Sequence, residues 1–298
     1  MKFDVGKIVP GKTFFITGTS YIGNPRSNTA MYITKKVERL LSALETVSEC
    51  LIFAEDSIDV PAGIDRNNAV VLTENPQLAY ARFANQFAAE RAGLERALRF
   101  RRTEEGYFIT EDCVVGENAY IEPGCVIGPD VQIGRNAVIL AGSTIKRATI
   151  GDDFIANENA VIGANGFTMA EDERGDKLRI PTLGRVLIGD HVEIGAHDNV
   201  SCGSSGDTVI EDNVKIDALV HIGHDVHLHK DVTITAGGII GGYCELNEHA
   251  YVGINAVLRN RITVGDGGFI GMGSTVTKSV EAGTTVAGNP ARLFEKKK

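Results

Sequence analysis

The chain has no tryptophan, only eight prolines among its 298 residues, and an aromatic content of 6%. Its five cysteines are odd in number and scattered, and none belongs to a C-x-x-C pair. This pattern argues against a disulfide framework and indicates reduced thiols in a cytosolic protein. The cysteines are Cys50, Cys113, Cys125, Cys202 and Cys244.

Positive charge is also scarce, since the formal net charge is −9 and the only basic run is 296–298. This balance excludes nucleic acid as the main partner. No apolar run approaches the roughly 20 residues that a membrane span needs. The start, Met1 to Asp4, lacks the layout of a signal peptide. We therefore expect a cytoplasmic protein without a membrane span.

Glycine is abundant, at 34 residues, and an aliphatic residue recurs every six positions from Val115 to Val276. A period of six fits neither a half-buried strand nor an amphipathic helix. It predicts a β-helix, in which each hexad adds one aliphatic side chain to an internal stack and small residues turn the corners. The longest unbroken series is Ile210, Ile216, Ile222, Leu228, Ile234, Ile240, Leu246, Val252, Leu258, Val264, Ile270 and Val276.

Residues 1–100 lack this period and predict a small α/β domain ahead of a β-helix domain at 101–298. Apolar runs predict strands at 13–16, 50–53 and 69–72, and helical spacing predicts helices at 34–44 and from about Pro76. The charged segment 90–105 is predicted to connect the two domains. The polar stretch 169–184 cannot line a core, so we expect it to leave the solenoid wall as a loop.

Four of the seven histidines fall between His221 and His229. His221 and His224 lie at or beside a turn, and Asp217 lies in the preceding hexad, where it is predicted to hold an imidazole in one tautomer. A neutral histidine is a suitable general base near neutral pH. One turn of a three-sided solenoid takes 18 residues, so Gly242 is expected beside His224, with its N–H as an oxyanion donor.

Several ordered motifs make the chain similar to left-handed β-helix (hexapeptide-repeat) acyltransferases. Over its whole length it resembles the UDP-3-O-acylglucosamine N-acyltransferase family of lipid A, and hence lipopolysaccharide, biosynthesis. The motifs that carry the resemblance are Asn24-Pro25 and the segments 75–81, 163–167, 181–186, 206–210, 215–217 and 221–225.

The resemblance implies that His224 is the general base, Asp217 its orienting partner and the Gly242 N–H the oxyanion donor. It also implies a homotrimer, whose donor groove lies between neighbouring solenoids. The remaining residues it implies are substrate contacts: His221 for the acceptor sugar, Tyr21 and Asn24 for the uracil, and Asn165 and Phe167 for the sugar or acyl chain.

The chain departs from the family pattern in three places. Ser27 stands where the family has an aromatic residue, which leaves uracil and thymine both open. The run 199–203 replaces the family's Ile-Asp-Arg-Gly. The segment 286–292 resembles coenzyme A-dependent sugar acetyltransferases instead of the family's helical C-terminal extension. Acyl-CoA is therefore favoured over acyl carrier protein, with Lys278 and Arg292 as contacts for its phosphates.

We predict an N-acyltransferase that acts on a nucleotide-linked amino sugar, with no metal and no permanently bound cofactor. Exposed aliphatic residues such as Val226 and Val232 are expected to be covered in the trimer. Three alternatives stay open: the lipid A enzyme with an acyl carrier protein donor, a non-catalytic scaffold, and a zinc carbonic anhydrase. The zinc ligands of such a carbonic anhydrase would come from His191, His197, His221 and His224. Cys202 is an alternative nucleophile.

Overall fold

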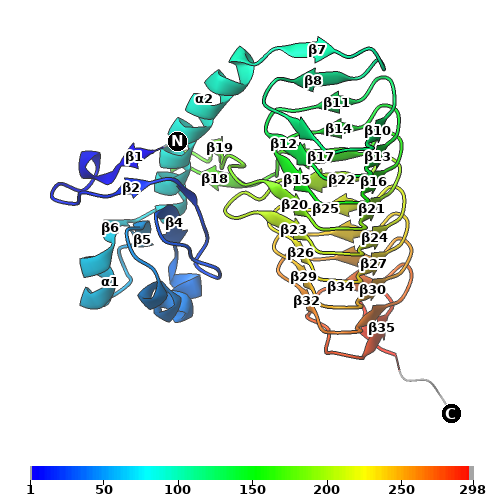
Figure 1. The fold of residues 1–298 in the computed structure, drawn as a ribbon. Helices are drawn as coiled ribbons and strands as arrows, with labels where there is room; N and C mark the ends of the chain where they lie inside the picture. Colours follow the sequence, from blue (N-terminus) through cyan, green and yellow to red (C-terminus); the bar gives the residue numbers. More distant parts are fainter. Residues whose placement is uncertain (1, 295–298) are drawn as a thin grey trace. The chain divides into compact units, whose positions relative to one another are not determined.

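The computed structural model describes residues 2–294, which form two compact units (Figure 1). Unit 1 comprises residues 2–94, 167–184 and 204–206, and unit 2 comprises 95–166, 185–203 and 207–294. Unit 1 therefore includes two segments that interrupt the solenoid in sequence. The first segment of unit 1 ends at residue 94, six residues before the predicted domain boundary at residue 100.

Unit 1 is built on a four-stranded parallel sheet with the order β3-β4-β5-β6. Its strands are β3 (Gly18–Thr19), β4 (Thr29–Ile33), β5 (Leu51–Glu55) and β6 (Ala69–Thr73), with a separate antiparallel pair, β1 (Phe3–Asp4) and β2 (Phe15–Ile16). The helices are α1 (Ala62–Asn67), α2 (Pro76–Ala97) and two 3₁₀ segments, η1 (Val5–Lys7) and η2 (Lys35–Thr46). The segment predicted as an α-helix at 34–44 is thus a 3₁₀ helix, and β4 had not been anticipated.

The long helix α2 begins where its sequence predicts. The Asn75 side chain accepts the N–H of Leu78 at 3.0 Å, and Pro76 occupies the first turn, where its missing N–H is no loss. Its apolar side, with Leu78, Phe83 and Phe87, is buried in the core of unit 1. The helix continues to Ala97, through much of the segment that had been predicted as a connection.

The excursion at 169–184 leaves the solenoid wall, as predicted, but it is not an irregular loop. It forms a hairpin of β18 (Met169–Glu171) and β19 (Lys177–Arg179), whose Ala170 lies buried in the core of unit 1. Side chains of α2 bind its backbone: Asn85 donates to the Arg179 carbonyl at 2.8 Å, and Arg91 to the Leu183 carbonyl at 3.2 Å.

Unit 2 is a three-sided parallel β-helix, and its short strands stack into three sheets (Figure 1). Face I holds β7 (Phe100–Arg102), β8 (Phe108–Thr110), β11 (Val126–Ile127), β14 (Thr144–Ile145), β17 (Val161–Ala164), β22 (Asn199–Ser201), β25 (His221–Ile222), β28 (Ile239–Ile240), β31 (Val257–Leu258) and β34 (Thr275–Val276). Face II holds β9 (Val114–Val115), β12 (Val131–Ile133), β15 (Ala148–Ile150), β20 (Val186–Ile188), β23 (Thr208–Ile210), β26 (His227–Leu228), β29 (Glu245–Leu246) and β32 (Thr263–Val264). Face III holds β10 (Tyr120–Ile121), β13 (Val138–Ile139), β16 (Ile155–Ala156), β21 (Glu193–Ile194), β24 (Lys215–Ile216), β27 (Thr233–Ile234), β30 (Tyr251–Val252), β33 (Phe269–Ile270), β35 (Thr285–Ala287) and β36 (Arg292–Leu293).

The hexad period corresponds to the inner stack of this helix, which confirms the predicted fold class. Ile222, Leu228 and Ile234 are each 0% exposed, and equivalent residues line the axis on all three faces. Many hexads also bury a second side chain, at the last residue before a strand. Val226 and Val232 occupy that second position and are fully buried, so the expectation that they are exposed is wrong.

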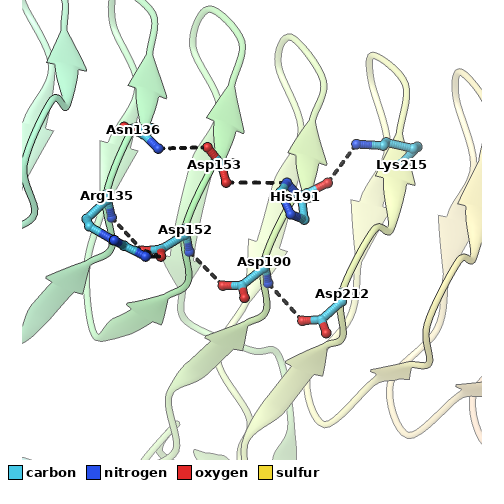
Figure 2. Close-up of polar contacts among 8 residues, drawn as sticks. All are labelled: Arg135, Asn136, Asp152, Asp153, Asp190, His191, Asp212 and Lys215. Carbon is cyan, nitrogen blue, oxygen red and sulfur yellow. Dashed lines mark hydrogen bonds and ion pairs between the residues drawn. The ribbon is translucent and has the colours of Figure 1, made fainter.

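The edge between faces II and III carries a ladder of carboxylates (Figure 2). Each aspartate accepts the edge N–H of the preceding coil: Asp152 from Arg135 at 2.7 Å, Asp190 from Asp152 at 2.7 Å and Asp212 from Asp190 at 2.8 Å. All four residues hold the second position after the inward aliphatic residue. In these three coils the backbone N–H at this position therefore donates to a carboxylate oxygen of the following coil.

Candidate active site

His224 and Asp225 lie at the edge between faces I and II, directly after β25. The Nδ1 atom of His224 is 2.8 Å from Oδ2 of Asp225, and the side chains are 15% and 2% exposed. Asp225 has a φ of 57°, a left-handed conformation that aspartate tolerates, and its own N–H donates to the Thr208 hydroxyl. A nearly buried carboxylate on Nδ1 retains the proton there and leaves Nε2 as the basic nitrogen.

This geometry corrects the role given to Asp217. Asp217 follows β24 and lies at the edge between faces III and I, one corner of the triangle away from His224. Its carboxylate accepts the N–H groups of Ala218 at 2.8 Å and Ala236 at 3.2 Å, which makes it a turn cap. A separation of one hexad carries the chain to the next corner, whereas the adjacent residue Asp225 shares the corner with His224.

Gly242 lies beside His224, as the 18-residue repeat predicts. A Cβ placed on Gly242 would lie 2.8 Å from both Cε1 and Nε2 of His224, closer than real Cβ contacts. Glycine is therefore the residue that fits there. The imidazole's basic nitrogen and the backbone of Gly242 consequently border the same space.

Gly242 is the second residue after the inward Ile240, at the edge between faces I and II, and so holds the position that Asp152 and Asp190 hold at the edge between faces II and III in Figure 2. The N–H groups of Asp152 and Asp190 bind carboxylate oxygens, but for the Gly242 N–H no acceptor occurs among the described residues. It is thus an outward donor of a kind that binds anionic oxygen elsewhere in this solenoid. This is the property that an oxyanion donor needs.

Sequence reasoning missed two aromatic and cationic neighbours of His224. The Tyr243 ring meets the imidazole edge-on at a centroid distance of 5.1 Å, and the Arg261 guanidinium lies 4.2 Å from the centroid of Tyr243. Asp225, Tyr243 and Arg261 are spaced by 18 residues, so the coil period that located Gly242 would also have located them. They form a column along the same edge.

His221 occupies the outward position of β25, on the same strand end as His224. Its partial burial, together with the neighbouring His224, lowers the pKa of His221. Its imidazole is therefore held neutral near pH 7, which suits hydrogen bonding to a sugar hydroxyl.

The remaining predicted substrate contacts are distributed over both units. In unit 1, Tyr21 and Asn24 bracket one turn after β3, closed by the Asn24 N–H on the Tyr21 carbonyl at 3.0 Å. Phe167, also in unit 1, is 75% exposed and lies 5.1 Å from the Arg179 guanidinium. In unit 2, Asn165 accepts a hydrogen bond from the buried Arg147 at 2.9 Å.

The two donor contacts are not brought together. Lys278 is exposed at the edge between faces I and II, where 224, 242, 260 and 278 are equivalent positions on successive coils. Arg292 is exposed in β36, at the end of face III. Cys202 is 0% exposed, which gives its sulfur no access to a substrate.

The histidines of the zinc alternative are dispersed over the solenoid. His191 lies at the edge between faces II and III, where its Nδ1 is 3.5 Å from Asp153 (Figure 2). His197 lies at the edge between faces III and I, and His221 and His224 belong to face I and the edge that follows it. Among residues 2–294, the only cluster of three side chains that could hold a metal is Glu211, His227 and His229, a different set.

Comparison with known proteins defines the class as a hexapeptide-repeat acyltransferase with a left-handed parallel β-helix. The family model for the bacterial transferase hexapeptide (six repeats) matches residues 112–147 and 207–242. Solved structures support the fold: a UDP-N-acetylglucosamine acyltransferase from Campylobacter jejuni is 24% identical, with a TM-score of 0.57 over 65% of this chain and 74% of that chain.

The chain belongs to the UDP-3-O-acylglucosamine N-acyltransferase family. The relative of that name from Caulobacter sp. (strain K31) is 37% identical over 83% of this chain and 74% of its own length. The relative from Coxiella burnetii (strain Dugway 5J108-111) is 40% identical over 80% of this chain and 67% of its own length. The relative from Rhizobium meliloti (strain 1021) is 39% identical over an aligned region that covers 52% of this chain and 44% of that protein. The described residues contain no helix long and apolar enough to cross a membrane.

Proposed function

We propose that this acyltransferase moves an acyl group from a thioester to the amine of a nucleotide-linked amino sugar. The observation that carries the proposal is one edge of the solenoid, where the basic nitrogen of His224 and the N–H of Gly242 border the same space. The names of the relatives indicate the acceptor class, a UDP-linked acylglucosamine.

The reaction needs a general base and an oxyanion donor, and it forms no covalent acyl-enzyme. The amine nitrogen attacks the thioester carbonyl, and Nε2 of His224 takes the proton that the nitrogen loses. The Gly242 N–H donates to the carbonyl oxygen as it becomes negative. The C–S bond then breaks, and the thiolate leaves with the proton that His224 returns. Asp225 keeps Nδ1 protonated and stabilises the imidazolium between these two transfers.

We place the binding site of the acyl donor along the edge between faces I and II. Adjacent strands lie about 4.8 Å apart, so Lys278, three coils beyond His224, lies about 14 Å along the edge. Arg261 lies on the same edge, two coils beyond His224. An extended pantetheine arm spans a distance of this order, and cations at its far end suit phosphates. These features support acyl-CoA as the donor.

For the acceptor, we propose that His221 contacts the sugar and that Tyr21 and Asn24 contact the base. Ser27 binds the backbone N–H of Ser48 at 3.1 Å and supplies no aromatic surface for stacking. Asn165 and Phe167 are proposed to contact the sugar or the acyl chain. The trimer remains part of the proposal, as does a cytoplasmic location. The exposed apolar side chains that would need cover are Ile239, Ile254, Val257, Phe269 and Met272, not Val226 or Val232.

A thiol-release assay with a UDP-linked amino sugar tests the donor and the reaction together. The panel contains acyl-CoA and acyl carrier protein donors of several chain lengths, with His224→Ala as the inactive control. We expect release with short acyl-CoA and loss of about 10²–10⁴-fold in kcat in His224→Ala. Activity only with long-chain acyl carrier protein would return the donor to the lipid A alternative. Turnover by His224→Ala near the parent rate would refute the mechanism.

A further inference from the structure

Face II carries a cluster of two histidines and two glutamates that the acyl-transfer reaction does not use. His227 and His229 flank the inward Leu228 in β26 and at the edge that follows it, so both imidazoles project outward. Their rings stack at a centroid distance of 3.9 Å and an interplanar angle of 20°. Glu211 contributes from the preceding coil, and Glu245 from the following coil.

The three inner donor atoms converge. Oε1 of Glu211 is 2.7 Å from Nε2 of His227 and 3.2 Å from Nδ1 of His229, and one ligand atom from each of the three residues lies within 4.8 Å of the other two. Zinc bonds of about 2.0–2.1 Å to nitrogen and oxygen place tetrahedral ligands about 3.3 Å apart. The separation between Glu211 and His229, 3.2 Å, matches this value, whereas the one between Glu211 and His227, 2.7 Å, is that of a hydrogen bond. A bound ion would replace that hydrogen bond after a small shift of the side chains.

The groups around these ligands orient them. Nε2 of His229 is 3.2 Å from Oε1 of Glu245, a carboxylate that accepts the Nε2–H and directs the Nδ1 lone pair toward Glu211. The other oxygen of Glu211 accepts the N–H of Lys230 at 3.1 Å, which turns Oε1 to the imidazoles. This arrangement, a histidine between a ligand position and a carboxylate, is typical of zinc sites.

We propose that Glu211, His227 and His229 bind a divalent transition-metal ion, with zinc as the preferred metal. The bound ion would link two neighbouring coils of face II. Two imidazoles and one carboxylate favour zinc, copper or nickel over magnesium and calcium, which prefer oxygen ligands. Because Glu211 comes from one coil and the histidines from the next, the ion connects two consecutive coils. The residues of the site belong to face II and to the edge that follows it, not to the edge of His224 and Gly242, and they supply no step of acyl transfer.

Zinc titration of tag-free, chelator-treated full-length protein by calorimetry tests the site. We expect one zinc ion per chain with micromolar or tighter affinity, no heat from magnesium, and a zinc-dependent rise in melting temperature. His227→Asn, His229→Asn and Glu211→Gln should each weaken binding at least tenfold and abolish the thermal shift. His249→Asn is the matched control, since His249 is an exposed edge histidine 3.7 Å from Asp231 and outside the cluster.

The result separates a built site from adventitious binding. Binding of zinc to the parent protein with unchanged affinity in His227→Asn and His229→Asn would overturn the proposal. So would loss of binding in His249→Asn, or no binding by the parent at micromolar zinc. Circular dichroism of each variant shows whether the solenoid is intact, and Glu211→Gln, which preserves size and a hydrogen-bond acceptor, guards against a folding defect.

Discussion

Asp225 and Asp217 offer a direct test of which carboxylate supports the catalytic base. In Asp225→Asn the anionic oxygen 2.8 Å from Nδ1 of His224 is replaced by a neutral amide. Because the pair is nearly buried, the variant loses a hydrogen bond to a charged group, worth about 1.5–3 kcal/mol. At 1.36 kcal/mol per decade, kcat should fall about 10- to 150-fold. Any population of the wrong tautomer would lower it further.

Asp217→Asn is the matched control for that substitution. Its carboxylate caps Ala218 and Ala236 at another edge, and the Asn oxygen still accepts one of these N–H groups. We expect kcat within about threefold of the parent, because a surface change of this kind alters free energies by about 0.5 kcal/mol. Both variants are measured by thiol release under saturating substrates. A larger loss in Asp217→Asn than in Asp225→Asn would show that the assignment of Asp225 is wrong.

Three further predictions follow from the same geometry. Gly242→Ala should lower kcat by about 10²-fold, since its Cβ would displace the His224 ring; Gly63→Ala, with no atom within 4 Å of its added Cβ, should keep full activity. Lys278→Ala should raise the KM for acyl-CoA about tenfold with little change in kcat, and Arg292→Ala should raise this KM less. Initial rates measured over a range of donor concentrations test both variants, and a loss confined to kcat would contradict the prediction. Burial raises the pKa of Asp198 to about 7 from 3.8 in the unfolded chain. The unfolded state therefore releases this proton first, and the free energy of unfolding should fall by about 1.4 kcal/mol per pH unit between pH 4 and 7, and level off above 7. Urea titrations of the parent and Asp198→Asn should show this slope only in the parent; parallel curves would rule it out.

The fold was readable from the sequence because a solenoid is locally determined. Every hexad turns one corner, so the position of Ile222 in the stack requires no knowledge of distant residues. The same register located Gly242 beside His224. It failed for Val226, because the hexad pattern identifies one inward residue, whereas the corner geometry buries a second, smaller one.

Unit 1 was less readable, because its elements depend on contacts between distant segments. The run 29–33 becomes a strand by pairing with β5, and the polar hairpin 169–184 is held by α2, about 90 residues away in sequence. Neither pairing leaves a period in the sequence. The segment 35–46 forms a 3₁₀ helix, a type that its apolar spacing did not indicate.

The sequence by itself determined the coil, its 18-residue period and hence the neighbours of His224 along the axis. The tertiary structure alone decided the neighbours around the axis, because three corners separate residues that are close in sequence. Asp217 is seven residues from His224 and belongs to another corner, whereas the adjacent Asp225 shares the corner and contacts the imidazole. Side-chain direction at a corner also depends on backbone dihedrals such as the left-handed φ of Asp225. The convergence of Glu211, His227 and His229 arose in the same way, from three outward side chains of two stacked coils.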